Sequence, residues 1–580
     1  MLAGVDTFDS AGRPEWGFTF ATVSLGNKHD LVSVAHPGLL PCVPATEMAA
    51  AGSSCRRPRG SCNIPFHGRE GTCGVWLGAS SASSTTEGGE ENTTSSRYWF
   101  LTGAEDLQLK VCTFSRPQHT HGLDSGGATA PSGLQCQRTW HGHPGSVQSM
   151  ACSALHVAAS SGGLHASPAH AVGLVVTGGT SDTLHCWLLR PPPQPSAGGE
   201  GTVGVEWLCT RDFDETSSQD QRVKALSVFP LPEDESAPTP STTPSTTTSA
   251  TSATPVRFFI VISGNSEGLL MMCLVDTHQR RVVEVGRFRE NSKPILALAC
   301  LRAPVARESS GTTATGAGEG AGEGAGAAAA GAAAGAGCSG ASGASGASDA
   351  PFVTLLVAGA TNGCLSVWNL EPALQVARRA AAILMSEPPA MQPVWDRDNP
   401  CDTARAALFD DARTGGHPRL LSVFQAHAMG VNCVSAAVDG RYVVVASGGD
   451  GEELVLSRFV VTSSSAAAAV GVEMRVQGSD LALDDVSMTM QAGVSTAGLR
   501  GVHVDTAARV VFLSGTDQRV TVWSYTEQEE QEQEQEREQE PEQEQGCVDD
   551  STRGWAKILW RGCAMSEIAA ISSIDVLQEG

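Results

Sequence analysis

The chain has 580 residues and a formal net charge of −24, and hydrophobic residues make up 41% of it. This length exceeds that of one small domain, and the apolar content is sufficient for a large core. Because phosphate affinity comes from Lys and Arg, the acidic balance disfavours a general phosphate-binding surface, and a local basic patch remains possible. No run of 18 apolar residues occurs and no secretory signal follows Met1, so we expect a cytoplasmic protein with reduced cysteines and no membrane association.

Residues 1–63 are expected to form a partial structural unit and a basic loop. Strand-like patterns occur at 16–26 and 30–38, but they do not make a complete unit. The loop contains the only tight basic cluster of the chain, formed by Arg56, Arg57 and Arg59. This cluster is a candidate for contact with RNA or an acidic partner, and a flexible surface loop is the simpler interpretation.

From residue 64 to residue 525 one pattern recurs. An apolar strand ends in Gly, a small residue and an acid or Asn, and a second strand follows at once and ends near a Trp. Gly, Asn and Asp tolerate positive φ or hydrogen-bond to their own backbone, so each copy predicts a β-hairpin. The six copies are FLTGAEDLQLKVC (100–112), VVTGGTSDTLHCW (175–187), VISGNSEGLLMMC (261–273), VAGATNGCLSVW (357–368), VASGGDGEELVL (445–456) and FLSGTDQRVTVW (512–523).

A further strand, preceded by His in several copies, lies upstream of the hairpin. The order of His, strand, strand, acidic turn and strand with Trp resembles the WD-repeat family, whose units are four-stranded blades. The resemblance implies an all-β WD-repeat β-propeller of about seven blades, with a hydrogen-bond network of His, turn acid and Trp inside a blade. The matching positions, which we expect to stabilise the blades, are His143, Asp182 and Trp187 in one copy, His427 and Asp450 in another, and Asp517 and Trp523 in a third. In the second of these copies, Leu456 or Arg458 stands near the Trp position.

Low-complexity sequence interrupts the repeats. Such stretches cannot bury enough apolar surface to order themselves, so we expect long disordered loop inserts at 78–96, 190–204, 232–255 and 307–350. A Glu/Gln-rich segment at 526–548 is expected to be disordered as well. Residues 549–580 contain two strand-like stretches that would complete one blade together with the N-terminus. The alternative is that the chain is the C-terminal part of a longer protein with several propellers.

Catalytic signatures are absent from the sequence. It has no GxSxG elbow, no phosphate loop ending in GK[ST], no HExxH and no GxGxxG that opens a helix. We therefore predict no enzyme activity, no catalytic residue, no bound cofactor and no metal site. His141 and His143 could form a metal pair, but His143 is better explained as the His of a blade. The cysteines inside strands are expected to be small buried hydrophobes, as for Cys112, Cys152, Cys186, Cys273, Cys300 and Cys433.

Two segments near the C-terminus, 424–461 and 498–525, narrow the resemblance. The pieces "QAH..GVN", "VASGG.DG" and "SGTDQRVTVW" look like the C-terminal part of the WD-repeat auxiliary subunit of the eukaryotic tRNA 2′-O-ribose methyltransferase, whose members are longer. The resemblance implies a non-catalytic scaffold. It would position tRNA so that the ribose 2′-OH of the anticodon wobble nucleotide reaches a partner methyltransferase that uses S-adenosylmethionine. The alternative is a general WD-repeat adaptor, such as a ubiquitin-ligase receptor or a trafficking scaffold.

Overall fold

The computed structural model describes the parts of the chain that form sheets, one helix and their short connections. No helix among these residues is long and apolar enough to cross a membrane. The described residues are 2–8, 14–23, 28–35, 64–65, 71–84, 93–117, 132–141, 143, 145–153, 173–180, 183–190, 204–212, 222–232, 256–290, 292–307, 351–386, 416–463, 481–517, 519–527, 555–565 and 576–577.

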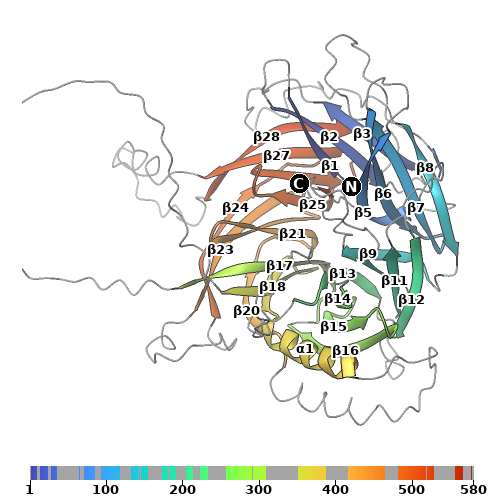
Figure 1. The fold of residues 1–580 in the computed structure, drawn as a ribbon. Coiled ribbons are helices and arrows are strands. Elements are labelled where there is room, and N and C mark those ends of the chain that lie inside the picture. The colour runs from blue at the N-terminus through green and yellow to red at the C-terminus, as the bar shows by residue number, and fades with distance from the viewer. Residues whose placement is uncertain are drawn as a thin grey trace, which may run out of the picture.

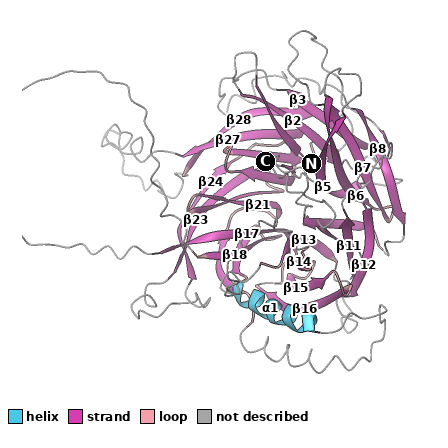
Figure 2. Cartoon of the chain, viewed as in Figure 1, coloured by secondary structure: helices cyan, strands magenta, loops and turns pink. Residues whose placement is uncertain are grey.

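The described strands form seven groups arranged around a common axis, as in a β-propeller, and the pairing within each group is antiparallel except between β1 and β29 (Figures 1 and 2). We number these groups as blades 1 to 7 in chain order. The predicted all-β propeller with four-stranded blades is confirmed. The predicted inserts at 190–204, 232–255 and 307–350 each connect two strands of one blade and lie almost wholly outside the described residues. The expected insert at 78–96 is shorter, because β5 runs to Ser84 and β6 starts at Thr93.

The strands of the seven blades have the following bounds. Blade 1 contains β1 (Leu2–Phe8), β2 (Pro14–Val23), β3 (Lys28–Ala35), β4 (Ile64–Pro65) and β29 (Val576–Leu577). Blades 2 to 4 contain β5 (Gly71–Ser84), β6 (Thr93–Ala104), β7 (Gln108–Pro117), β8 (Ser132–His141); β9 (Val147–Ser153), β10 (Gly173–Gly179), β11 (Thr183–Arg190), β12 (Gly204–Asp212); and β13 (Val223–Pro230), β14 (Phe258–Asn265), β15 (Leu269–Asp276), β16 (Arg281–Arg289). Blades 5 to 7 contain β17 (Ile295–Arg307), β18 (Phe352–Ala360), β19 (Cys364–Asn369), β20 (Arg419–Gln425); β21 (Val431–Asp439), β22 (Tyr442–Gly449), β23 (Leu454–Ser463), β24 (Leu481–Gln491); and β25 (Leu499–Asp505), β26 (Val510–Gly515), β27 (Arg519–Glu527), β28 (Ala556–Met565).

Within each of blades 2 to 7 the strands pair in chain order, and the first strands of consecutive blades contact one another from β5 to β25. The second strand is the core of a blade. Every residue of β14, for example, is buried, which explains its nearly unbroken apolar sequence. The fourth strand lies at the rim, and β20 has no fully buried residue. In blade 1, β29 pairs in parallel with β1, so strands from both ends of the sequence share one sheet.

The Gly of the repeated pattern separates neighbouring blades. A Cβ placed on Gly264 of β14 would lie 2.6 Å from the Cγ2 atom of Ile295, the first residue of β17 in the next blade. Such a distance is shorter than any ordinary carbon contact. The same contact joins four further pairs of blades, through Gly103 and Val147, Gly178 and Val223, Gly359 and Val431, and Gly448 and Leu499. The repeated Gly is therefore required by packing between blades, in addition to any role in the hairpin turn.

Blades 5 and 6 are joined more closely than the others. The last residues of β17 leave their own blade and pair in parallel with β23, from Val305 opposite Val461 to Arg307 opposite Ser463. This pairing makes one eight-stranded sheet from two blades. Val305, Phe459 and Val461 are buried in the hydrophobic cluster that the two blades share. The junction is thus held by both backbone hydrogen bonds and apolar packing.

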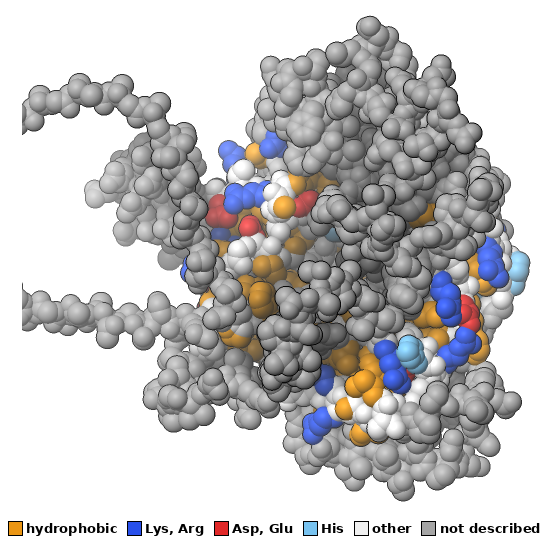
Figure 3. All heavy atoms as spheres, viewed as in Figure 1, with side chains coloured by type: hydrophobic (Ala, Val, Ile, Leu, Met, Phe, Trp, Pro, Cys, Tyr) orange, Lys and Arg blue, Asp and Glu red, His pale blue; other side chains and the backbone are white. Residues whose placement is uncertain are grey.

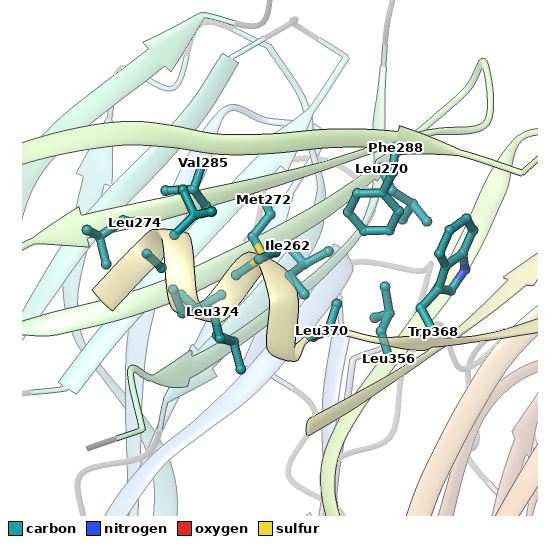
Figure 4. Close-up of a cluster of buried hydrophobic side chains, with 14 of the residues drawn as sticks. Ile262, Leu270, Met272, Leu274, Val285, Phe288, Leu356, Trp368, Leu370 and Leu374 are labelled. Atoms are coloured by element: carbon teal, nitrogen blue, oxygen red, sulfur yellow. The ribbon is translucent and has the colours of Figure 1, made fainter. Parts of the chain in front are cut away.

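A single helix occurs among the described residues, and the fold remains all-β as expected. Helix α1 (Glu371–Ser386) follows β19 directly and packs against β15 and β16 of blade 4. The side chain of Asn369 accepts a hydrogen bond from the Glu371 backbone N–H at 2.9 Å and so caps the helix. Leu374 lies among the side chains of Met272, Leu274 and other residues of blade 4 (Figure 4). The helix covers apolar surface that blade 4 would otherwise expose.

Candidate functional site

The clearest polar network of a blade is centred on His427, between β20 and β21 of blades 5 and 6. Its ring is buried, its Nδ1 atom lies 3.1 Å from Oε1 of Glu453, and its Nε2 atom lies 2.8 Å from Oγ of Ser447. A carboxylate only accepts hydrogen bonds, so Nδ1–H donates to Glu453 and Nε2 of a neutral ring accepts from the Ser447 hydroxyl. Burial lowers the pKa of His427, and the Glu453 carboxylate opposes this effect. Through a neutral His, the network therefore joins the segment before β21 to Ser447 of β22 and to the turn before β23.

The acid in this network differs from the one that the sequence pattern indicates. Asp450 is half-exposed, accepts a hydrogen bond from Nδ2 of Asn432 at 2.7 Å and lies 3.8 Å from Nη2 of Arg500. Glu453 stands three residues further along the turn and takes the contact with His427 instead. The turn between β22 and β23 is thus long enough for Glu453 to reach His427.

The strand register also shows which residue of blade 6 stands where other blades have a Trp. Ser457 pairs with Val445, just as Trp187 pairs with Val175 in blade 3. Trp555, which precedes β28 of blade 7, belongs to the same buried cluster as Leu456, and its indole N–H donates to the Leu456 carbonyl at 3.1 Å. The neighbouring blade thus contributes an aromatic side chain next to the strand of blade 6 that lacks the Trp.

In blade 3 the predicted His143 and Trp187 are both buried but belong to separate contacts. Nδ1 of His143 donates to the Gly145 carbonyl at 2.6 Å, and the indole N–H of Trp187 donates to Oγ1 of Thr177 at 3.0 Å. Asp182 lies outside the described residues. The pattern gave no sign of His185, whose ring centroid lies 4.4 Å from that of His143. Burial, and secondarily the neighbouring His143, lowers the pKa of His185 to about 4, so it is neutral at physiological pH.

In blade 7 the predicted Asp517 and Trp523 also act separately. Asp517 accepts hydrogen bonds from Oγ of Ser495 at 2.9 Å and from the backbone N–H of Thr496 at 3.1 Å, so it fixes the segment that leads into β25. The indole N–H of Trp523 donates to Oγ1 of Thr521 at 3.0 Å. Asp517 therefore orders a loop, while Trp523 fills the core between blades 6 and 7.

An exposed apolar surface lies on the rim strands of blades 5 and 6, where β20 contacts β24. Met488 and Met490 alternate along β24 and are 41% and 56% exposed, and a shift in the register of β20 places Leu420 and Val423 on one face of that strand. We call Leu420, Val423, Val486, Met488 and Met490 the β20/β24 surface. Flexible Met side chains are frequent at protein-binding surfaces, and β24 lies off the main strand path of its sheet and pairs only with β23.

The basic cluster and the possible metal ligands considered in the sequence analysis have no site among the described residues. Arg56, Arg57 and Arg59 lie outside the described residues. In the part of the chain that the structure describes, no group of three or more His, Cys, Asp and Glu is placed to hold a metal ion. On the face shown in Figure 3, the described basic, acidic and apolar side chains are interspersed. That view therefore shows no continuous basic surface over the described residues.

Comparisons with known proteins give only a distant likeness of fold. No protein-family model and no curated protein matches the chain. A crystal structure of Sqt1 from Chaetomium thermophilum bound to the N-terminus of ribosomal protein L10 aligns with a TM-score of 0.32 and 12% identity, over 73% of this chain and 68% of that chain. A second crystal structure of Sqt1 from the same organism aligns with a TM-score of 0.31 and 12% identity, over 74% of this chain and 65% of that chain. At these values the likeness carries no weight for function, and the propeller rests on the sheets of the chain itself.

Proposed function

We propose that this chain is a non-catalytic scaffold that holds a partner methyltransferase and positions tRNA for 2′-O-methylation of the wobble ribose. The observation that carries the proposal is the position of the two telling sequence segments. Segment 424–461 runs from the end of β20 through β23, and segment 498–525 runs from the start of β25 through most of β27. The two segments supply the first three strands of blade 6 and of blade 7. The residues of the β20/β24 surface lie just outside them, on β20 before residue 424 and on β24, which pairs with β23. The sequence resemblance and an exposed apolar surface are therefore adjacent in the propeller.

The proposed occupant of the β20/β24 surface is the catalytic subunit, which uses S-adenosylmethionine. Apolar side chains that alternate with polar ones on a rim strand offer both side-chain contacts and a free backbone edge to another protein. An acidic chain attracts tRNA poorly, so the catalytic subunit would supply most phosphate contacts. The contribution of this chain to the reaction would be the correct placement of the reacting ribose, which is a large part of many rate enhancements.

Copurification with a matched pair of variants tests the docking surface. Met490 on β24 and Met385 on α1 are almost equally exposed, at 56% and 58%. Met490→Asp is expected to reduce recovery of a methyltransferase with the tagged chain at least tenfold, whereas Met385→Asp should leave it unchanged. Equal recovery with both variants would rule out the β20/β24 surface as the docking site.

Mapping of modified nucleotides tests the function itself. Loss of the gene should remove 2′-O-methylation of the wobble ribose and leave other ribose methylations intact. The purified chain with tRNA and S-adenosylmethionine should transfer no methyl group until the catalytic subunit is added. Unchanged wobble methylation would overturn the proposal. Recovery of a ubiquitin ligase or coat subunit with the chain would then favour the general adaptor, for which the exposed β20/β24 surface is equally suitable.

A further inference from the structure

Two pairs of cysteines occupy corresponding places in neighbouring blades. Cys112 of β7 pairs directly with Cys136 of β8 in blade 2, and Cys186 of β11 pairs with Cys209 of β12 in blade 3. Both pairs join the third and fourth strands of a blade and adjoin a shift in register. Cα atoms of directly opposed residues in an antiparallel sheet lie about 4.5 or 5.5 Å apart, and both values fall within the range that a disulfide bridges. All four residues are free thiols in the structure.

The two pairs differ in access to solvent. Cys136 is exposed on the rim strand, whereas Cys112 behind it is fully buried. Cys186 and Cys209 are both buried, with 1% and 8% of their surfaces exposed. A soluble oxidant can therefore reach Cys136 directly, but it cannot reach either member of the second pair without an opening of blade 3. This difference makes the second pair a natural control for the first.

The surroundings of Cys136 favour its thiolate. The side chains of Cys112 and Cys136 are hydrogen-bonded, and Oγ1 of Thr139 lies 3.8 Å from the Cys136 sulfur. The hydrogen bond from Cys112 lowers the pKa of Cys136 to about 6 against the opposing effect of partial burial, and Thr139 and the Lys110 ammonium add to the lowering. Burial raises the pKa of Cys112 well above the ordinary value. The pKa of Cys186 is also raised well above the ordinary value, first by its hydrogen bond with Cys209 and then by burial. The thiolate is the reactive form of cysteine, so Cys136 is the nucleophile of the pair and Cys112 is its buried neighbour.

We propose that Cys136 and Cys112 form a redox-active dithiol site that hydroperoxides convert to a disulfide between β7 and β8. The Cys136 thiolate attacks a peroxide oxygen, the O–O bond breaks, and the leaving hydroxide takes a proton from solvent to give water. Cys136 is then a sulfenic acid. The Cys112 sulfur attacks the Cys136 sulfur, the S–O bond breaks, and the departing hydroxide takes the Cys112 proton to form a second water. In total two thiols are oxidised, one hydrogen peroxide is reduced, and a thiol reductant reverses the change.

The disulfide would fix the outer strand of blade 2 to its neighbour. Strands β7 and β8 are connected through residues 118–131, so the bridge would close a loop around that connection. Cys112 was expected from the sequence to be an inert buried hydrophobe, and its burial is confirmed. What distinguishes it from Cys273 or Cys433 is the exposed Cys136 directly opposite on β8. The site would thus couple the stability of one rim strand to the supply of peroxide.

The experiment uses the full chain, reduced and then treated with equimolar hydrogen peroxide. Free thiols are blocked, disulfides are reduced and labelled with a second reagent, and labelled peptides are identified by mass spectrometry. Peptides with Cys112 and Cys136 should carry the second label at least tenfold more than peptides with Cys186 and Cys209. Equal labelling of the two pairs, or a disulfide from Cys136 to another cysteine, would overturn the proposal.

Three variants separate the steps. Cys136→Ser should abolish the disulfide. Cys112→Ser keeps a hydrogen-bond donor beside Cys136 but cannot form the disulfide, so it should stop the reaction at the sulfenic acid, which dimedone traps on Cys136. Cys209→Ser, the control in blade 3, should leave oxidation of the first pair unchanged. Alkylation of Cys136 in the reduced chain should be half-maximal near pH 6, because the Cys112 thiol, the Thr139 hydroxyl and the Lys110 ammonium favour its thiolate. A half-maximum near pH 8.5, as for an ordinary thiol, or no dimedone adduct in Cys112→Ser would refute the assignment of Cys136 as the nucleophile.

Discussion

Removal of the Glu453 carboxylate should destabilise blade 6 more than removal of the Asp450 carboxylate. Glu453 is only 12% exposed at its side chain and accepts from the buried His427, so Glu453→Ala leaves a buried N–H without its partner. A hydrogen bond to a charged group is worth roughly 1.5–3 kcal/mol, and we expect a loss of this size. The Asp450 side chain is 44% exposed, and its hydrogen bond from Asn432 and its 3.8 Å contact with Arg500 are both open to solvent, so Asp450→Ala should cost less than about 1 kcal/mol.

Hydrogen–deuterium exchange of the backbone amides in β22 and β23 measures this difference locally. Exchange through opening of blade 6 should be roughly 10- to 100-fold faster in Glu453→Ala than in the parent chain, because about 1.4 kcal/mol corresponds to a factor of ten. Glu453→Gln keeps an oxygen acceptor and should fall between the parent and Glu453→Ala. An Asp450→Ala variant that exchanges as fast as Glu453→Ala would refute the structural assignment and restore Asp450 as the acid of this blade.

Three further perturbations follow from the packing. The folded-state pKa of His185 is lowered to about 4, so its contribution to stability is fully present above pH 6.5 and is lost as the pH falls toward 4. In urea unfolding, His185→Leu should remove about 2–3 kcal/mol of this pH dependence. The control His278→Leu, at an exposed position, should leave the pH dependence intact. Gly264→Ala should lower the melting temperature in a thermal scan, because overpacking costs about 1–3 kcal/mol. Gly286→Ala is the control and should not lower the melting temperature, because open space surrounds that position. An unchanged melting temperature in Gly264→Ala would contradict the contact between blades. Leu374→Ala should cost about 2–4 kcal/mol in urea unfolding by leaving a cavity between α1 and blade 4, and a loss below about 1 kcal/mol would show that the helix is not firmly packed.

The hairpins were predictable because each depends on neighbouring residues. The apolar run, the turn residues and the alternating second arm lie within about a dozen positions, and all six copies fall on the second and third strands of blades 2 to 7. The contacts of Glu453 were not predictable from the pattern. The hydrogen bond depends on the path of the turn after Asp450, and a side chain three residues away reaches His427 only because that turn folds back.

Other features depend on segments that are distant in sequence. The apolar side chains of α1 recur at helical spacing through Leu374, Ala377, Ala381 and Leu384, which could have indicated the helix. Its partner surface on blade 4 comes from residues about 100 positions earlier and has no signature in the helix itself. The exposure of Cys136 likewise depends on the position of β8 at the rim, and the Arg56, Arg57 and Arg59 cluster and Asp182 stay predictions outside the described residues.

The glycine contact between blades has a consequence for how this sequence could acquire its long inserts. The spacing of adjacent blades is set where Gly264 meets Ile295 or Gly448 meets Leu499, by surfaces that touch directly. The loops that connect the strands of a blade do not set the distance between blades. The entropic cost of closing such a loop also rises only slowly as the loop lengthens. Repeat expansion between the strands of a blade is then nearly neutral in evolution, while a single methyl group at one of these five glycines is not. Among homologues, the lengths of the inserts should therefore vary widely, whereas the side-chain volume at these five glycine positions should stay constant.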